Sequence, residues 1–310
     1  MIARVYIQAA ATISHQPVFG VRGFAASLSP LERGSELVQP AYKEYIDPMA
    51  LRRMSKILRM SITSAREALR QSDIAQPRGI IVGTGLGCLL DTEKFLSNFL
   101  TLEGLIPPTS FILSTHNTIA GQISLNLGCH SYNITHTQNT LSFETALIDG
   151  LMKIEEGESP VLVGAADEHI PFLDTVAAEW GYTRLQLTSA ASFYVLSGQA
   201  SSESLAEVLD AEVIAGQNGT DESVISGFLE RNGLTLAEMD LILSSGTAVK
   251  TDVKQMDYTA YSGIYPTASA FAFHYGADYL SSVSGSRYVL IVNRLRPENT
   301  GLVLLKSIEA

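Results

Sequence analysis

Cysteine is scarce in this sequence. The 310 residues include only Cys88 and Cys129, too few for a disulfide framework, so a reducing cytoplasm is the expected compartment. His169 follows two acidic residues, but no histidine or cysteine stands at metal-ligand spacing from it. The sequence therefore predicts no disulfide network and no metal site, and Cys129 is expected to be an ordinary buried thiol.

Positive charge and long apolar runs are also lacking. Lys and Arg total 21 against 32 Asp and Glu, a net charge of −11, which disfavours nucleic acid or an anionic membrane as the main partner. No apolar run approaches the roughly 20 residues that a membrane span requires. Residues 2–12 resemble a first strand rather than a signal peptide. We therefore expect a cytoplasmic globular protein with no nucleic-acid or membrane partner.

A glycine-rich stretch lacks the marks of a nucleotide-binding loop. An apolar strand beginning at Gly79 runs into Gly83-Thr84-Gly85-Leu86-Gly87, yet neither a Gly-Lys-Ser/Thr ending nor G-x-G-x-x-G spacing is present. Close backbone packing between strand and loop is the preferred interpretation of these glycines.

What the sequence does contain is an alternation of strands and helices. With 46% hydrophobic and 17% charged residues, the chain is typical of α/β proteins whose strands are buried on both faces. A break near Gly198–Ser204 divides it into residues 1–200 and 201–310. Gly121 is expected to permit close approach of a neighbouring backbone. The remaining strands are predicted at 132–137, 160–168, 190–196, 206–215, 240–244, 287–293 and 301–307, and helices at 47–71, 91–102, 118–127, 221–232 and 267–283.

One basic cluster interrupts the acidic composition. Arg52, Arg53, Lys56 and Arg59 lie on the predicted helix 47–71. A solvated helix face is the preferred interpretation, and a dock for an acidic carrier or phosphate is the alternative.

The rest of the chain is organised around residues 131–157. A short strand, predicted to be buried, is followed by the polar elbow Gln138-Asn139-Thr140 and an amphipathic helix. Helix N-termini favour anionic groups, and a strand–elbow–helix unit commonly presents a nucleophile. No cysteine stands in this elbow, and its neighbourhood offers only the hydroxyls of Thr135, Thr137 and Thr140.

The order and spacing of five segments resemble the β-ketoacyl synthase branch of the thiolase superfamily. The segments are residues 52–69, 79–87, 120–128, the elbow, and 161–168. The resemblance implies a five-layered αβαβα fold of two similar halves. It also implies a dimer across the elbow region, involving residues 118–127 and the helix from Thr140. Acyl chains would arrive on the phosphopantetheine of acyl carrier protein, with no other cofactor.

Active members of that family use an elbow cysteine and two histidines, and this sequence replaces all three. Aligned from the strand side, which is better anchored, the cysteine position falls on Gln138; counted back from the helix end, it falls on Thr140. The first histidine is matched by Ser245 of Ser245-Gly246-Thr247, and the second by Ser269 of Thr267-Ala268-Ser269. Residues 292–297 replace the family's glycine-rich gating loop. These losses predict that the condensing reaction is gone.

The resemblance then points to the chain-length factor, a silent relative that pairs with an active ketosynthase. Glutamine in the elbow is the pattern of that subgroup, because an amide can mimic an acylated thiol. The chain also resembles short ketosynthase-like proteins of aryl-polyene or flexirubin-type pigment clusters. Partners would be an active ketosynthase, or a second copy, and acyl carrier protein.

Two other functions stay open. One is a divergent active 3-oxoacyl synthase that uses Thr140, Ser245 or a displaced His274. The other is a homodimeric acyl-binding protein without catalysis. A serine hydrolase built on Ser245, His274 and Asp252 is disfavoured because no G-x-S-x-G elbow is present. His136, two residues before the elbow, is expected to be a satisfied core or interface histidine.

Overall fold

The computed structural model describes residues 4–101, 108–181, 186–215, 222–245 and 249–308. Its ten strands form one hydrogen-bonded series in the order β3-β2-β4-β5-β1-β6-β10-β9-β7-β8. The strands are β1 (Val5–Ile13), β2 (Gly79–Gly83), β3 (Tyr132–His136), β4 (Val161–Asp167), β5 (Ala190–Ser197), β6 (Ala206–Ala215), β7 (Leu241–Ser244), β8 (Gln255–Asp257), β9 (Tyr288–Asn293) and β10 (Asn299–Lys306).

The two sets of five strands have the same internal order. Read from its outer edge, the first set runs third, second, fourth, fifth, first, and β6–β10 repeat that order from the opposite edge. Among the described strands, the two sets are joined where Val5–Ile7 of β1 pairs antiparallel with Ala206–Val208 of β6. The predicted fold of two similar halves is therefore confirmed.

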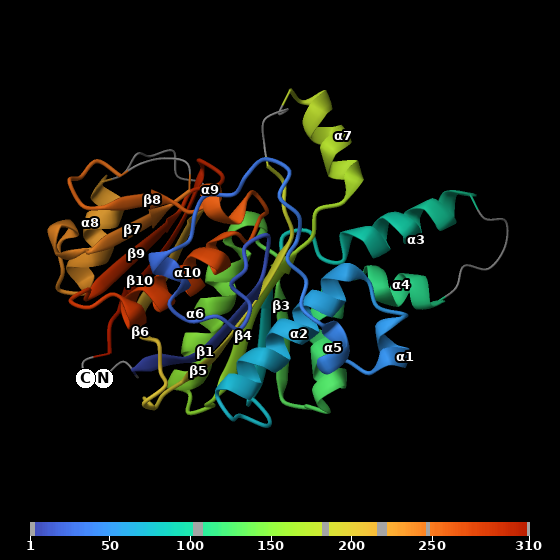
Figure 1. Cartoon of the computed structure of the whole chain (residues 1–310), viewed down its shortest axis with the longest axis horizontal. Coiled ribbons are helices and arrows are strands. Elements are labelled where there is room, and N and C mark those ends of the chain that lie inside the picture. Colours follow the sequence, from blue (N-terminus) through green and yellow to red (C-terminus); the bar gives the residue numbers. More distant parts are fainter. Residues whose placement is uncertain (1–3, 102–107, 182–185, 216–221, 246–248, 309–310) are drawn as a thin grey trace.

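Helices fill three layers around these two sets (Figure 1). Helices α2 (Lys56–Gln71) and α5 (Thr118–Leu127) pack on one face of the first set. Helices α6 (Ser142–Glu155) and α10 (Ser269–Ser282) lie between the two sets. Helix α8 (Glu222–Arg231) covers the outer face of the second. Alternate residues of β10 divide between layers, since Val303 and Leu305 face the central helices while Leu302 and Leu304 face α8.

Several predictions need correction. The single helix predicted over 47–71 is two helices, α1 (Pro48–Leu51) and α2. The side chain of Asp47 caps the first, and the second begins after Ser55, so the chain turns at 52–55. Strand β3 is not buried, because it is the edge of the series: two of its five residues are exposed and the other three are partly buried. Gly121 meets no neighbouring atom within 4 Å, so the predicted close approach is wrong.

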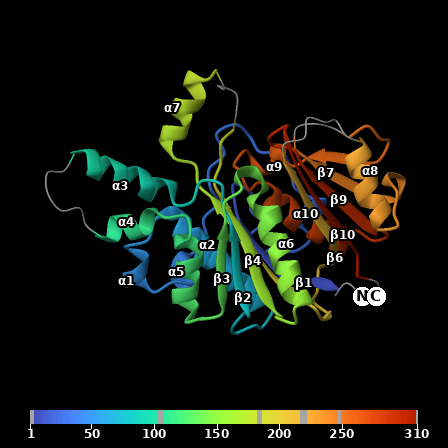
Figure 2. The ribbon, with the colours of Figure 1, turned by 180° about the vertical axis from the view of Figure 1, so that it is seen from behind.

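Other elements were not predicted. These are the short strand β8 and the helices α4 (Pro108–Ser114), α7 (Pro171–Glu179) and α9 (Thr259–Ser262). The predicted helix 91–102 is α3 (Leu89–Thr101). Helices α3 and α4 form an arm, and α7 projects beside it, away from the layered body (Figures 1 and 2).

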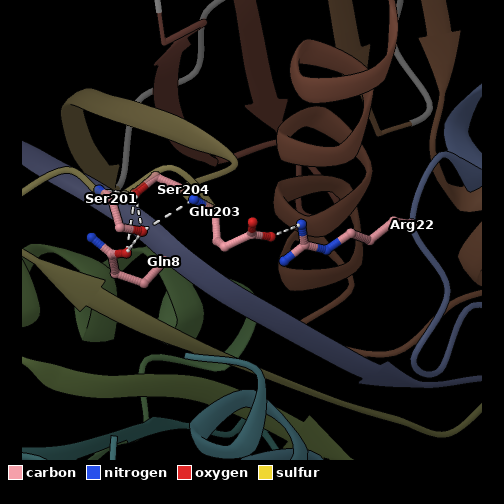
Figure 3. A network of polar contacts seen from close by, with 5 residues as sticks. All are labelled: Gln8, Arg22, Ser201, Glu203 and Ser204. Carbon is pink, nitrogen blue, oxygen red and sulfur yellow. Dashed lines mark hydrogen bonds and ion pairs between the residues drawn. The ribbon is translucent and has the colours of Figure 1, made fainter. Parts of the chain in front are cut away.

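The segment between the halves is fastened to the first strand. The hydroxyls of Ser201 and Ser204 donate to Gln8 Oε1 of β1, at 2.5 and 3.1 Å. Glu203 pairs with Arg22 at 2.8 Å (Figure 3). The division of the chain at residue 200 stays a prediction, but the turn at that place is held by polar contacts on both sides.

Candidate functional site

The glycine-rich loop after β2 encloses an internal carboxylate. Asp167, the last residue of β4, is fully buried. Its Oδ1 accepts from the Thr84 hydroxyl at 2.9 Å and from the Leu86 N–H at 2.8 Å. The Gly85 N–H donates to the same oxygen at 3.0 Å. Successive N–H groups in a loop of this kind make an anion-binding nest, and here the protein supplies the anion, so the loop has no space for a phosphate.

Asp167 also fixes the start of α10. Its Oδ2 accepts from the N–H and hydroxyl of Thr267, at 3.1 and 2.7 Å. Burial raises the pKa of Asp167, and the hydrogen bonds from Thr267, Leu86 and Thr84 oppose the rise. One carboxylate therefore ties the glycine-rich loop to the segment that matches the family's second histidine motif.

Backbone packing around the elbow requires the loop's glycines. A Cβ at Gly83 would lie 2.4 Å from the Ser142 carbonyl oxygen, and one at Gly85 would lie 2.3 Å from Pro266 Cβ. The predicted role of these glycines in close packing is confirmed. Asn139 in the elbow has a φ of 55°, a left-handed conformation that asparagine tolerates better than most residues.

Asn293, at the end of β9, joins the elbow to the second half. Its Nδ2 donates to the Thr140 carbonyl oxygen at 2.7 Å and to Glu144 Oε1 at 2.8 Å. Ser269 Oγ lies 3.4 Å from the same nitrogen. The Tyr258 hydroxyl donates to Asn293 Oδ1 at 3.2 Å. All five residues are buried, so they form a closed polar cluster beneath the elbow.

Ser245 and Ser269, which are predicted to match the family's histidines, both lie at this cluster. Ser269 contacts Asn293, and Ser245 accepts the N–H of the next residue, Arg294, at 2.6 Å. Ser245 is buried after β7, whereas Gly246 and Thr247 of its motif lie outside the described residues. No thiol or imidazole takes part in the hydrogen bonds of this described cluster.

The two candidates for the elbow position lie at different depths. Gln138 is exposed and precedes a short 3₁₀ turn, Asn139–Leu141. Thr140, inside that turn, is 5% exposed, and its hydroxyl has no hydrogen-bond partner among the described residues. Which of them stands at the family's cysteine position stays a prediction, but only Thr140 touches the buried cluster.

His274 lies elsewhere in the core. Its Nδ1 is 2.9 Å from the Thr12 hydroxyl of β1, and its ring packs edge-on against Phe24 and Tyr194. Burial lowers the pKa of His274 to about 3, so the ring is neutral. These contacts hold α10 against the first sheet and leave no role for His274 at the elbow.

His136 and His169 also lie close to partner side chains within the fold. His136 Nε2 lies 2.8 Å from Asp149 of α6, as expected of a satisfied interface histidine, and His169 Nε2 lies 2.9 Å from Asp174 of α7. Within the described ranges, no group of three or more histidine, cysteine or acidic side chains could hold a metal ion. Cys129 is fully buried, as expected.

An apolar cavity of about 290 Å³ lies over the elbow. Thr140, Pro266 and Leu295 form one side, and α7 supplies Leu173 and Val176 on the other, with Trp180 just beyond the helix. Helix α7, which forms this side of the cavity, was not predicted, although the spacing of Leu173, Val176 and Ala177 after Pro171 is a short helical signal. The cavity can hold a small apolar group beside a buried hydroxyl.

The predicted basic cluster does not act as a unit. Lys56 donates to the His169 carbonyl and the Ser189 hydroxyl, both at 3.0 Å, and burial lowers its pKa. Arg59 donates to the Met54 carbonyl at 2.9 Å. Arg52 and Arg53 are exposed in the turn between α1 and α2. Two of the four cations are therefore used inside the fold.

Apolar side chains at the edge beside β3 are exposed to solvent. Tyr132 of β3, Leu125 of α5 and Met152 of α6 are exposed there, Leu125 at 73%. An unpaired edge strand with exposed apolar neighbours is a typical site of association. The arm adds a further exposed apolar set: Leu96, Phe99, Leu100, Phe111 and Ile112.

Sequence comparison gives one family match. The family described as "Beta-ketoacyl synthase, N-terminal domain" matches residues 30–224. No curated protein matches the chain.

Solved structures share the fold at low sequence identity. The ishigamide ketosynthase/chain length factor is 17% identical with a TM-score of 0.79, covering 99% of this chain and 100% of its own. A type II polyketide synthase acyl carrier protein in complex with its ketosynthase is 15% identical with a TM-score of 0.78, and the match covers 99% of this chain and 100% of that chain. A ketosynthase in complex with its chain length factor from Xenorhabdus doucetiae is 12% identical with a TM-score of 0.75, and the match covers 99% of this chain and 98% of that chain. The described residues include no helix with the length and apolarity needed to cross a membrane.

Proposed function

The chain belongs to the β-ketoacyl synthase family, and from this premise we propose that it is a non-condensing partner subunit of the chain-length-factor type. It would pair with an active ketosynthase in polyketide, aryl-polyene or fatty-acid-type synthesis that depends on acyl carrier protein. Its contribution would be to shape the space available to the growing chain, while the partner supplies the reacting cysteine.

The observation that carries this proposal is the closed cluster around Asn293. A condensing site needs a thiolate and imidazoles that can reach substrate. Ser245 and Ser269 are predicted to stand at the histidine positions, and the Asn293 amide is hydrogen-bonded to the elbow carbonyl and to Glu144. Among the described residues, this cluster contains neither a thiol nor an imidazole, which suits a structural subunit better than a reacting one.

The edge at β3 supports pairing. Strand β3 pairs only with β2 among the described strands, so its outer backbone groups are available to a second chain. Leu125, Tyr132 and Met152 beside it would be buried by such a partner. Two of the compared structures are ketosynthase and chain-length-factor assemblies, and a partner of that fold is the one we propose.

Co-expression with a ketosynthase tests the pairing. The wild type should co-purify with the ketosynthase and alter the length of its products, and Met152→Glu should break the pair because it places a charge in the buried edge. Val21→Glu is the matched control, since Val21 is also exposed, at 45%, but lies in the loop after β1. A protein that ignores every ketosynthase offered and forms a stable homodimer would overturn the proposal.

The cavity over Thr140 favours one second candidate, a homodimeric acyl-binding protein. Its apolar wall and its volume of about 290 Å³ suit a short hydrocarbon chain. Binding of acyl-pantetheine by the chain alone, with no effect on any ketosynthase, would support this candidate against the first.

A further inference from the structure

The side chain of Glu144 occupies an unusual position between the two halves of the molecule. It is fully buried on α6, one turn beyond Thr140, and its carboxyl group contacts the β10 backbone at Gly301, where an added Cβ would lie 2.8 Å from Glu144 Cδ. Oε1 accepts from Asn293, and Oε2 has no hydrogen-bond partner among the described residues. A buried, half-satisfied carboxylate is costly unless it is neutralised.

The groups that face Glu144 supply no positive charge. Helix α10 presents the Ser269 hydroxyl, β9 ends in the Asn293 amide, and the segment before α9 contributes the Tyr258 phenol, whose pKa is itself raised by burial. Arg294, the residue after Asn293, donates Nε to Thr300 Oγ1 at 3.2 Å. No ion pair joins Glu144 to a cation within the described part of the chain.

We propose that the protonation state of Glu144 controls how tightly α6 packs against the second half of the molecule. With its proton in place, the neutral carboxyl group packs against Gly301 and accepts from the same amide that holds the Thr140 carbonyl. Loss of the proton leaves the Glu144 carboxylate ionised and without a counter-charge between the halves, and water must enter to solvate it. The elbow and the cavity above it would then loosen as pH rises.

The sign of the effect follows from the direction of the pKa change. Burial raises the pKa of Glu144 from 4.5 to about 6. An acid with a raised pKa contributes stability that is fully present below pH 4.5 and is lost as pH rises through 6. The shift corresponds to about a 30-fold change in the folding equilibrium constant across that window.

The test compares unfolding of wild type, Glu144→Gln and Glu67→Gln from pH 5 to pH 8. Glu67 is the matched control: it is also buried, but it accepts from Arg70 at 2.6 and 2.7 Å and from Tyr45 at 2.9 Å, and its pKa is lowered. Glu144→Gln should gain stability relative to wild type by about 8-fold in the equilibrium constant between pH 5 and pH 8, because the rest of the 30-fold change lies below pH 5. Glu67→Gln should lose stability throughout this range.

Two measurements on the wild type keep the proposal testable if a variant fails to fold. The infrared band of a protonated carboxyl group should titrate with a midpoint near pH 6, and amide exchange over residues 138–147 should accelerate through the same pH. Parallel stability curves for wild type and Glu144→Gln, or a wild type without that titrating band, would overturn the proposal. Neither readout involves a ketosynthase, so failure of the pairing would leave this result unchanged.

Discussion

Replacement of Asp167 should destabilise the protein more than any exposed acid can. Its carboxylate accepts from five donors on two segments: the Thr84 hydroxyl and the Gly85 and Leu86 amides of the glycine-rich loop, and both donors of Thr267. Each donor left unsatisfied in the interior costs about 1–3 kcal/mol, although neighbouring losses do not add. Removing one member of a buried charged network typically costs about 3–5 kcal/mol. We therefore expect Asp167→Ala to lose about 3–5 kcal/mol.

Asp167→Asn refines the test because it retains the shape of the side chain. One of its two carboxamide positions is an NH₂ group, which would face donors rather than acceptors, so we expect a loss of about 2–4 kcal/mol. Denaturant unfolding measures both values, and Asp174→Asn, at a side chain 61% exposed, should stay within about 0.5 kcal/mol of wild type. An Asp167→Asn variant equally close to wild type would refute the reasoning.

Asp167→Asn should also alter the surroundings of Trp180 at the cavity. Pro266, next to Thr267, and Leu86 both line it, and so does Trp180, the single tryptophan of the chain. Loss of the Asp167 contacts should therefore change the native-state fluorescence of Trp180, whereas Asp210→Asn, in β6 of the other half, should leave it unchanged.

Four further substitutions have clear expectations. Gly83→Ala should cost more than about 2 kcal/mol because its Cβ would meet the Ser142 carbonyl, whereas Gly121→Ala, in open space on α5, should gain about 0.5–1 kcal/mol, both read from denaturant unfolding. Phe273→Ala should lose about 3–5 kcal/mol in the same assay, because the ring is fully buried between Phe143 and Tyr194. Since burial lowers the pKa of His274, its stabilising contribution is present above pH 6.5 and falls as the pH drops toward 3, so thermal unfolding of His274→Gln should be less acid-sensitive than that of wild type.

Several predicted elements agree closely with the structure. Strand β6 and helix α5 match their predicted bounds, and β4, β9 and β10 differ by one or two residues. The apolar runs of β4, β9 and β10 are buried almost throughout, so there the run reflects burial directly. The exposure of β3 could not be predicted in this way, since its apolar run resembles that of a central strand. Its place at the edge depends on which strands lie beside it.

The sequence could predict that the family's cysteine and histidines are missing from the site, but it could not predict the roles of the residues that form the site instead. The absence of cysteine and histidine at matched positions is visible in the residues alone. The roles of Glu144 and Asn293 depend on contacts between segments about 150 residues apart, which no local pattern specifies. The positions of Gln138 and Thr140 differ in depth because a 3₁₀ turn precedes α6, and helical periodicity does not predict such a turn.

The central claim, that this chain pairs with a ketosynthase without carrying the reacting group, is tested most directly by intact-mass analysis. The complex would be incubated with acyl-loaded and malonyl-loaded carrier protein, and both subunits would be weighed. The account predicts an acyl adduct on the ketosynthase, none on this chain, and longer products when both subunits are present. An adduct on this chain alone, at Thr140 or elsewhere, or malonyl decarboxylation by the isolated protein, would contradict it.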